Sequence, residues 1–259
     1  MLSGPAVAAV YTAATRFLVV GQFVNQALAN VMEPQLGRLI ALDDRSAARA
    51  AYRVATGWLV ILCWPLYLVA ATYAHWFLDW FGVGYDAGTS VVVILAATML
   101  VATSIGMVDV VLLMAGRARW NLANSSLALV VFVVLDLILI PPFGLVGASI
   151  GWAAAILLNN LLPLAQVWRS LGMHPFGRST AIAVLLAITC FGVLPAATYL
   201  VVGNGLVWSL AATTLGGLVY AGGCWHWRSV LSLDVLSRRG RRPRSAASTA
   251  AVRPDEEIQ

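Results

Sequence analysis

Long runs of apolar residues alternate with short polar connections along most of this chain. A bilayer core about 30 Å thick is crossed by roughly 20 helical residues at 1.5 Å each. On that measure the pattern predicts seven spans, which cover residues 7–31, 57–79, 88–115, 120–141, 144–168, 179–202 and 205–227. We therefore expect an all-α, polytopic membrane helix bundle over residues 1–236.

The composition supports a membrane solvent for this bundle. Hydrophobic residues make up 61% of the 259 residues and charged residues only 10%, whereas a soluble domain has about 25% charged residues. One soluble core could not hide so much apolar surface. These values exclude a water-soluble enzyme, a disulfide scaffold and a disordered chain.

The arginines predict the orientation of the spans. All sixteen basic residues are Arg, and fifteen of them fall in alternate connections or after the last span, while the loops around Gly84, Phe143 and Asn204 contain none. Positive charge gathers on the cytoplasmic side of membrane proteins. We expect the N-terminus outside and the C-terminus in the cytoplasm of a bacterial cell, with the chain in its cytoplasmic membrane.

The C-terminal segment, residues 237–259, differs from the rest of the chain. It carries six arginines, small residues and a short acidic run, a composition typical of disorder. Arginines beside a membrane attract anionic headgroups, by about 1 kcal/mol each. We expect a disordered cytoplasmic tail whose partners are membrane lipids and not nucleic acid.

The sequence offers no catalytic or metal-binding motif. It lacks a Gly-x-Ser-x-Gly elbow, a His-Glu-x-x-His pair and a phosphate-binding Gly-x-x-x-x-Gly-Lys loop. Cys63, Cys190 and Cys224 are widely spaced in apolar runs and are expected to be buried thiols. His75 and His226 stand among aromatic residues at span ends, as interfacial residues do. We expect no enzyme, no cofactor and no metal.

The first expected span differs from the others because it carries many polar residues. On a helix, these polar residues, except Asn25, fall within about a third of the circumference. The opposite face holds Ala13, Phe17, Val24, Leu28 and Val31. We expect that apolar face to meet lipid and the polar face to line a wet cavity or pack against polar partners. The candidate cavity residues are Thr12, Thr15, Arg16, Gln22, Asn25, Gln26 and Asn30.

Arg16 lies about ten residues into this span, where a charge costs on the order of 3 kcal/mol. It either marks a substrate path or forms a buried ion pair, with Asp109 or Asp136 as the possible carboxylate. Those two carboxylates are also the candidates for coupling transport to protons. Alternatively, Asp136 lies near the outer surface and Asp109 reaches the inner headgroups.

Proline and glycine residues predict bends and close packing within the spans. Pro65, Pro163 and Pro195 each remove a backbone donor and favour a kink, and the pair Asn159–Asn160 could satisfy carbonyls freed near Pro163. Gly144, Gly147 and Gly151 form a small-residue ridge suited to close helix packing.

Five segments, in this order, resemble the multidrug/oligosaccharidyl-lipid/polysaccharide flippase superfamily, especially its bacterial polysaccharide-export branch of the O-antigen and teichoic acid type. The resemblance covers about residues 5–175. The segments are Val10–Arg16 (VYTAATR), Glu33–Arg38 (EPQLGR), Phe81–Ala87 (FGVGYDA), Met114–Arg117 (MAGR) and Ile140–Ala148 (IPPFGLVGA).

Members of that superfamily have two pseudosymmetric helix bundles around a central cavity, and the resemblance places this chain in the C-terminal half. It implies a flippase that moves a polyprenyl-pyrophosphate-linked oligosaccharide across the membrane by alternating access. Arg16 would hold the phosphates, and Gln22, Gln26 and Asn30 would meet sugar hydroxyls, with Asn25 at the edge. The expected partners are the missing N-terminal half or another membrane subunit. The alternatives are a multidrug or small-solute exporter of the same fold and a non-transporting membrane assembly subunit.

Overall fold

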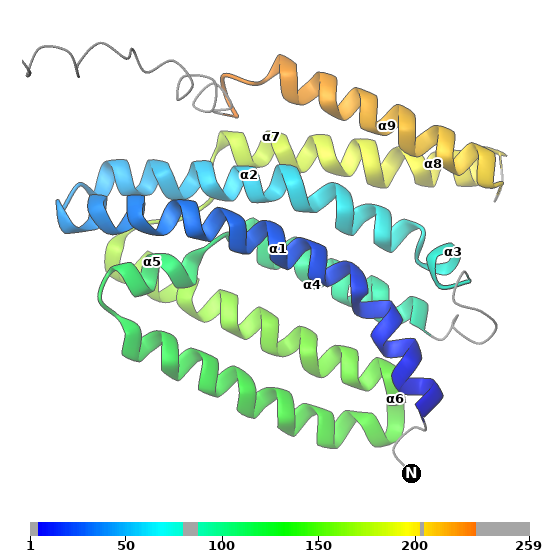
Figure 1. Ribbon diagram of the computed structural model, residues 1–259, viewed down its shortest axis with the longest axis horizontal. Helices are drawn as coiled ribbons and strands as arrows, with labels where there is room; N and C mark the ends of the chain where they lie inside the picture. The colour runs from blue at the N-terminus through cyan, green and yellow to red at the C-terminus, as the bar shows by residue number, and fades with distance from the viewer. Residues whose placement is uncertain (1–4, 80–87, 203–204, 232–259) are drawn as a thin grey trace, which may run out of the picture.

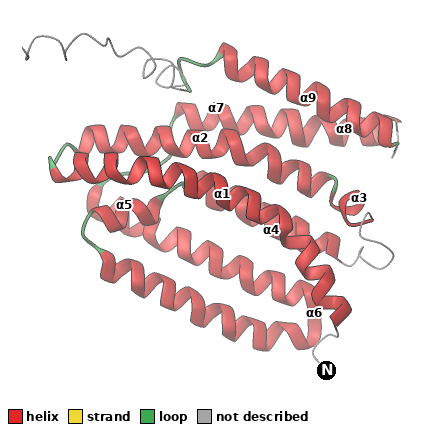
Figure 2. Cartoon of the chain, in the orientation of Figure 1, coloured by secondary structure: helices red, strands yellow, loops and turns green. Residues whose placement is uncertain are grey.

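The computed structural model describes residues 5–79, 88–202 and 205–231, and these residues are helical almost throughout, with no strand (Figures 1 and 2). The all-α class expected from the sequence is confirmed. The elements are α1 (Pro5–Ala41), α2 (Arg45–Thr72), α3 (Ala74–Asp79), α4 (Thr89–Ile105), α5 (Val108–Met114), α6 (Ala118–Leu171), α7 (Arg178–Ala187), a π-helical turn (Ile188–Val193), α8 (Leu194–Val202) and α9 (Leu206–His226).

Five helical segments of the described chain are long and apolar enough to cross a membrane. They are Arg45–Thr72, Thr89–Met114, Ala118–Leu171, Arg178–Thr198 and Val207–His226. These segments overlap six of the expected spans, because α6 contains two of them. The expected first span, 7–31, lies within α1, which is not among the five. The chain therefore has the helices of a membrane protein.

The 54-residue α6 is a hairpin of two antiparallel arms (Figure 1). The chain reverses at Gly144, whose φ of 54° and ψ of −124° are not helical. The arms then pack closely, since Gly147 and Gly151 carry no side chains. A Cβ at Gly147 would overlap the Leu139 carbonyl, and one at Gly151 would overlap the Asp136 carboxyl. Further along the arms, Asn124 and Gln166 exchange two hydrogen bonds of 2.8 and 2.9 Å.

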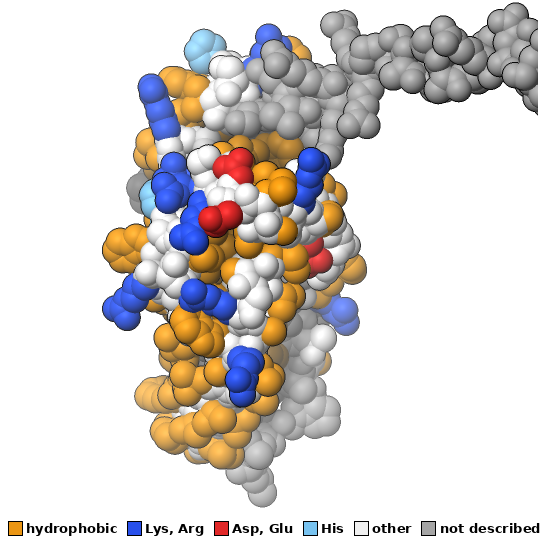
Figure 3. All heavy atoms as spheres, turned by 90° about the vertical axis from the view of Figure 1, so that its left-hand side faces the viewer, with side chains coloured by type: hydrophobic (Ala, Val, Ile, Leu, Met, Phe, Trp, Pro, Cys, Tyr) orange, Lys and Arg blue, Asp and Glu red, His pale blue; other side chains and the backbone are white. Residues whose placement is uncertain are grey.

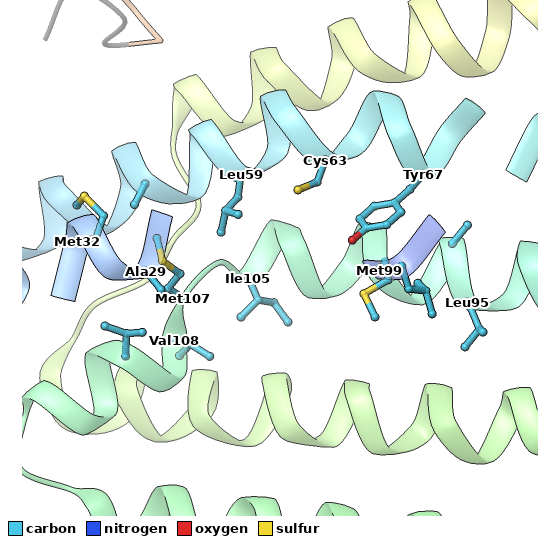
Figure 4. Packing of buried hydrophobic residues seen from close by; sticks show 14 of the residues in the cluster. Ala29, Met32, Leu59, Cys63, Tyr67, Leu95, Met99, Ile105, Met107 and Val108 are labelled. Atoms are coloured by element: carbon cyan, nitrogen blue, oxygen red, sulfur yellow. The ribbon is translucent and has the colours of Figure 1, made fainter. Parts of the chain in front are cut away.

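The main core lies between α1, α2 and α4–α5, with the second arm of α6 beneath it (Figure 4). Its fully buried side chains include Leu59 and Tyr67 of α2, Leu95 of α4 and Met107 at the α4–α5 junction. A second, smaller core joins α2 to α7, the π-helical turn and α9. α2 thus contributes to both cores.

The tight turn between α1 and α2 ends in a helix cap. The Asp44 carboxylate accepts hydrogen bonds from the Ala47 backbone N–H at 3.0 Å and the Ser46 hydroxyl at 2.8 Å. These bonds favour the charged form and hold the pKa of Asp44 below its usual value. The cap fixes where α2 begins.

Hydroxyl groups of neighbouring helices donate to backbone carbonyls near two prolines. Pro65 leaves Ile61 without its helical donor, and the Tyr220 hydroxyl of α9 donates to the Ile61 carbonyl at 2.9 Å. Pro195 follows the π-helical turn, where the Phe191 carbonyl accepts from the Thr72 hydroxyl at 3.4 Å. Membrane helices tolerate proline through such bonds.

The amides before Pro163 act differently from the expectation. Asn160 Nδ2 donates to the Ile156 carbonyl at 2.8 Å, whereas the proline frees the carbonyl of Asn159. The Asn159 side chain accepts a 3.1 Å hydrogen bond from Ser125 on the other arm of α6. The pair therefore bonds within and between the arms and does not satisfy the freed carbonyl.

The expected span 88–115 is not one continuous helix. It breaks at Gly106 and Met107, between α4 and α5, where Gly106 has a φ of 75° and a ψ of −152°. The break removes the helical donor for Ile105, and the Tyr52 hydroxyl of α2 donates to that carbonyl at 2.6 Å. Apolar periodicity could not predict this break, because its stabilising partner comes from another helix.

Replacing the Tyr220 hydroxyl should destabilise the protein only while Pro65 is present. We expect Tyr220→Phe to lower the free energy of unfolding by about 1 kcal/mol, the size of a hydrogen bond between membrane helices. In a Pro65→Ala background, the restored N–H can bond to Ile61, so the same change should cost less. A double-mutant cycle of unfolding in mixed micelles measures both values; equal costs in the two backgrounds would contradict this account.

Candidate functional site

Most polar residues of α1 lie on the side of the helix away from the core, whereas Asn25 lies on the side of the buried residues and borders a cavity. Arg16, Gln22, Asn25, Gln26 and Asn30 are exposed, as is Thr12, while Thr15 is half-buried. The buried residues of α1 instead include Ala14, Leu18, Met32 and Leu36. We call the set Thr12, Thr15, Arg16, Gln22, Asn25, Gln26 and Asn30 the polar face.

The apolar residues opposite the polar face do not form a lipid-facing surface, contrary to the expectation. Ala13 is 6% exposed, and Val24 and Leu28 pack against the main core. Only Val31, at 47% exposure, remains largely uncovered. Phe17 lies in α1, but its side chain is outside the described part. α1 therefore turns its apolar side to α2, α4 and α5 and leaves its polar face uncovered.

Arg16 does not form an ion pair with Asp109 or Asp136, the two partners that the sequence suggested. Among the described residues, neither Asp109 nor Asp136 bonds to it, and the ion pair found there joins Arg45 to Asp43 at 3.1 Å. Asp109 lies exposed in the first turn of α5. Asp136 lies half-buried between the arms of α6, where its Oδ1 is buried and receives no hydrogen bond from the described residues. The two carboxylates thus lie on different elements.

Some polar groups of α1 already bond within the helix. Gln26 Nε2 donates to Asn30 Oδ1 at 3.0 Å, one turn further along. The Thr15 hydroxyl donates to the Thr12 carbonyl at 3.1 Å. These bonds hold the Gln26, Asn30 and Thr15 side chains along the helix surface.

A cavity of about 160 Å³ opens beside Gln22 and Asn25, at the level of the α4–α5 break. The volume suits several water molecules or one small polar group. Its walls come from four helices, and they are Gly21, Gln22, Asn25, Leu59, Tyr67, Met99, Ala102, Thr103, Gly106, Ile156 and Asn160. Figure 4 shows Tyr67 pointing from α2 towards Met99 of α4.

The structure thus brings Gln22 and Asn25 together with polar groups that sequence reasoning missed. Tyr67 and Thr103 stand in apolar runs, where nothing marks them as cavity residues. Gly106 was a usable signal, because a glycine at the end of an apolar run can allow a break. Arg16 does not line this cavity; it lies six residues, or about 9 Å along a helix, before Gln22.

The cavity chemistry suits a neutral, hydroxylated group. Amide side chains and hydroxyls donate and accept hydrogen bonds, while Leu59, Met99 and Ile156 supply apolar walls. Within the described chain, no group of three His, Cys, Asp or Glu side chains could hold a metal ion. Arg16 of the polar face supplies a positive charge about 9 Å along the helix from this cavity.

No protein-family model, curated protein or solved structure matches the chain. The motifs of the sequence can still be placed on the fold. Val10–Arg16 lies in α1, Met114–Arg117 ends α5, and Ile140–Ala148 forms the turn of the α6 hairpin. Phe81–Ala87 lies outside the described residues.

Proposed function

We propose that this chain is the C-terminal half of a membrane flippase that moves a polyprenyl-pyrophosphate-linked saccharide for cell-surface polysaccharide synthesis. One observation carries the proposal: Arg16 and the amides of α1 lie uncovered, with Val19 and Phe23 beside them, on a bundle whose other surfaces are largely apolar. The order of the five sequence motifs supports the same conclusion.

An uncovered polar face is costly in hydrocarbon. A central arginine alone costs about 2.5–3.5 kcal/mol on insertion scales, and charged residues within spans normally face a bundle interior or a water-filled path. A second helix bundle, separated from α1 by an aqueous cavity, would remove that cost. The N-terminal half of a flippase, or another membrane subunit, would supply it.

The proposal includes seven membrane crossings with the arginines on the cytoplasmic side. At 1.5 Å per residue, a straight α6 would be about 80 Å long, more than twice the bilayer core. The reversal at Gly144 gives each arm the length of one crossing. With α1 as the first crossing, the arginine-bearing turns at Asp43 and Arg117 lie on the same side.

In the proposed mechanism, Arg16 attracts the pyrophosphate, since a guanidinium binds phosphate oxygens with two parallel hydrogen bonds. Gln22, Gln26 and Asn30 then bond sugar hydroxyls along the helix, and Asn25 does so from the cavity. The two bundles then rock against each other, which opens the aqueous cavity between them to one side of the membrane and then to the other.

Replacing Arg16 tests this proposal. We expect Arg16→Ala to reduce export of surface glycan in the native host at least tenfold, at an unchanged level of protein in the membrane. Arg16→Lys keeps the charge but loses the two-pronged geometry, so it should retain part of the export. Glycan on the cell surface, measured with an impermeant lectin, gives the rate, and immunoblots of membranes give the level.

Arg45→Ala is the matched control, because Arg45 is an exposed arginine in the α1–α2 turn, paired with Asp43. It should leave export unchanged. Unchanged export in Arg16→Ala would contradict the anion anchor and favour a small-solute exporter. Unchanged export on deleting the whole chain would instead favour a non-transporting assembly subunit.

A further inference from the structure

Arginines from three elements surround the short connection between α6 and α7, residues 172–177. Arg53 of α2 donates from Nη2 to the His174 ring nitrogen Nε2 at 2.6 Å and from Nε to the His174 carbonyl at 3.3 Å. Arg49 lies one turn earlier, where its Nη2 would be 3.6 Å from a Cβ at Gly172. Arg169 ends α6 and Arg178 begins α7, both exposed.

Beside His174, the hydrogen-bond partner of Arg53, the surface is hollowed by a groove of about 520 Å³. Its lining is mostly apolar and consists of Leu164, Trp168, His174 and Phe176. Trp168 is 62% exposed and Phe176 is 53% exposed, so both rings face the surroundings of the protein. Aromatic rings in such positions mark the boundary between hydrocarbon and headgroups.

The charge around this groove is uncompensated. Within the described chain, none of Arg49, Arg53, Arg169 and Arg178 pairs with a carboxylate. Arg49 Nε is buried and finds no hydrogen-bond acceptor among the described residues. The first turn of α7 also has no side-chain cap at Gly177, so its backbone N–H groups add positive potential. Figure 3 looks onto this end of the bundle, where arginine side chains are spread over the surface.

We propose that this groove binds one anionic phospholipid of the surrounding bilayer. The phosphate bonds to Arg169, Arg178 and the outer edge of Arg53, and an acyl chain lies along Trp168 and Phe176. Apolar walls beside a cationic rim match the two ends of such a lipid, whereas a zwitterionic headgroup would bring its own cation to the arginines. The site goes beyond the proposed transport function, because it lies on α6, α7, their connection and Arg53 of α2 and does not use the polar face.

Native mass spectrometry of the full chain in detergent tests the site directly. With dioleoylphosphatidylglycerol as the probe, we expect one lipid to bind before all others. Because an arginine near the surface contributes about 1 kcal/mol, Arg169→Gln and Arg178→Gln should each weaken that binding about fivefold. Dioleoylphosphatidylcholine should bind at least tenfold more weakly than the anionic lipid.

Arg38→Gln is the matched control, an exposed arginine in the last turn of α1, and it should leave the first binding event unchanged. Trp168→Ala keeps every charge and should weaken binding through lost contact with the acyl chain. Equal binding of both lipids, or an equal loss in Arg38→Gln, would overturn the proposal. The proposal would also be overturned if equimolar polyprenyl phosphate displaced the bound lipid. A lipid-free dimer held together through this groove would overturn it as well.

Discussion

Gly106→Ala should lower the free energy of unfolding by about 3 kcal/mol or more. Two costs add at this position. A φ of 75° with a ψ of −152° is a conformation that side-chain-bearing residues rarely adopt, worth about 1–3 kcal/mol. The new Cβ would also overlap the side chain of Thr56, which is fully buried and bonded to the Tyr52 carbonyl at 2.9 Å. Such overpacking costs about 1–3 kcal/mol.

Gly116 provides a comparison in which no neighbouring atom obstructs the new Cβ. It has a nearly identical φ of 74°, but a Cβ there would meet nothing within 4 Å. Gly116→Ala should therefore cost only the backbone term, about 1–2 kcal/mol. Equilibrium unfolding in mixed micelles, followed by tryptophan fluorescence, compares the two variants. If both variants lose the same free energy of unfolding, the Thr56 side chain does not obstruct a Cβ at Gly106.

Gly147→Ala should also lower the free energy of unfolding, by about 3 kcal/mol. Here the obstacle is backbone: a Cβ would overlap the carbonyl carbon and oxygen of Leu139 on the facing arm of α6. Backbone cannot rotate aside as a side chain can, so the two arms must separate. Their separation also strains the hydrogen bonds that join the arms at Asn124 and Gln166.

Gly217→Ala provides the comparison in another helix. Gly217 lies within α9, and a Cβ there would meet no atom within 4 Å. Alanine is favoured over glycine in a helix by about 0.5–1 kcal/mol, so this change should be neutral or slightly stabilising. Unfolding of both variants in the same micelles measures the difference. A Gly147→Ala protein as stable as the wild type would mean that the arms do not touch at this point.

Apolar runs predicted the helical class and the approximate place of most helices, because a bilayer demands about 20 apolar residues in a row. They did not predict where the helices end. α2 begins at Arg45, twelve residues before the expected span 57–79, and α1 continues to Ala41, ten residues beyond the expected limit. A helix continues through polar residues once nucleated, so hydropathy marks the expected crossing and not the helix.

The polar face was also visible in the sequence, since helical periodicity alone groups its members. Its surroundings were not. The cavity beside Gln22 needs Thr103 and Asn160 from helices far along the chain, and only packing brings them together. The same holds for the apolar side of α1, where Leu28 meets the core although nothing local distinguishes a core face from a lipid face.

The hydroxyl bonds at the helix breaks have a consequence for motion. The hydroxyls of Tyr52 and Thr72 in α2 donate to the carbonyls of Ile105 and Phe191. In α2 itself, the Ile61 carbonyl accepts from the Tyr220 hydroxyl of α9. Each bond lies at the weakest point of a helix, so bending there must first break a bond to or from α2. Between membrane helices such a bond is worth about 1 kcal/mol, which slows bending about fivefold. α2 therefore takes part in a hydrogen bond at three irregular points, two in other helices and one before its own Pro65, so a movement of α2 would disturb all three.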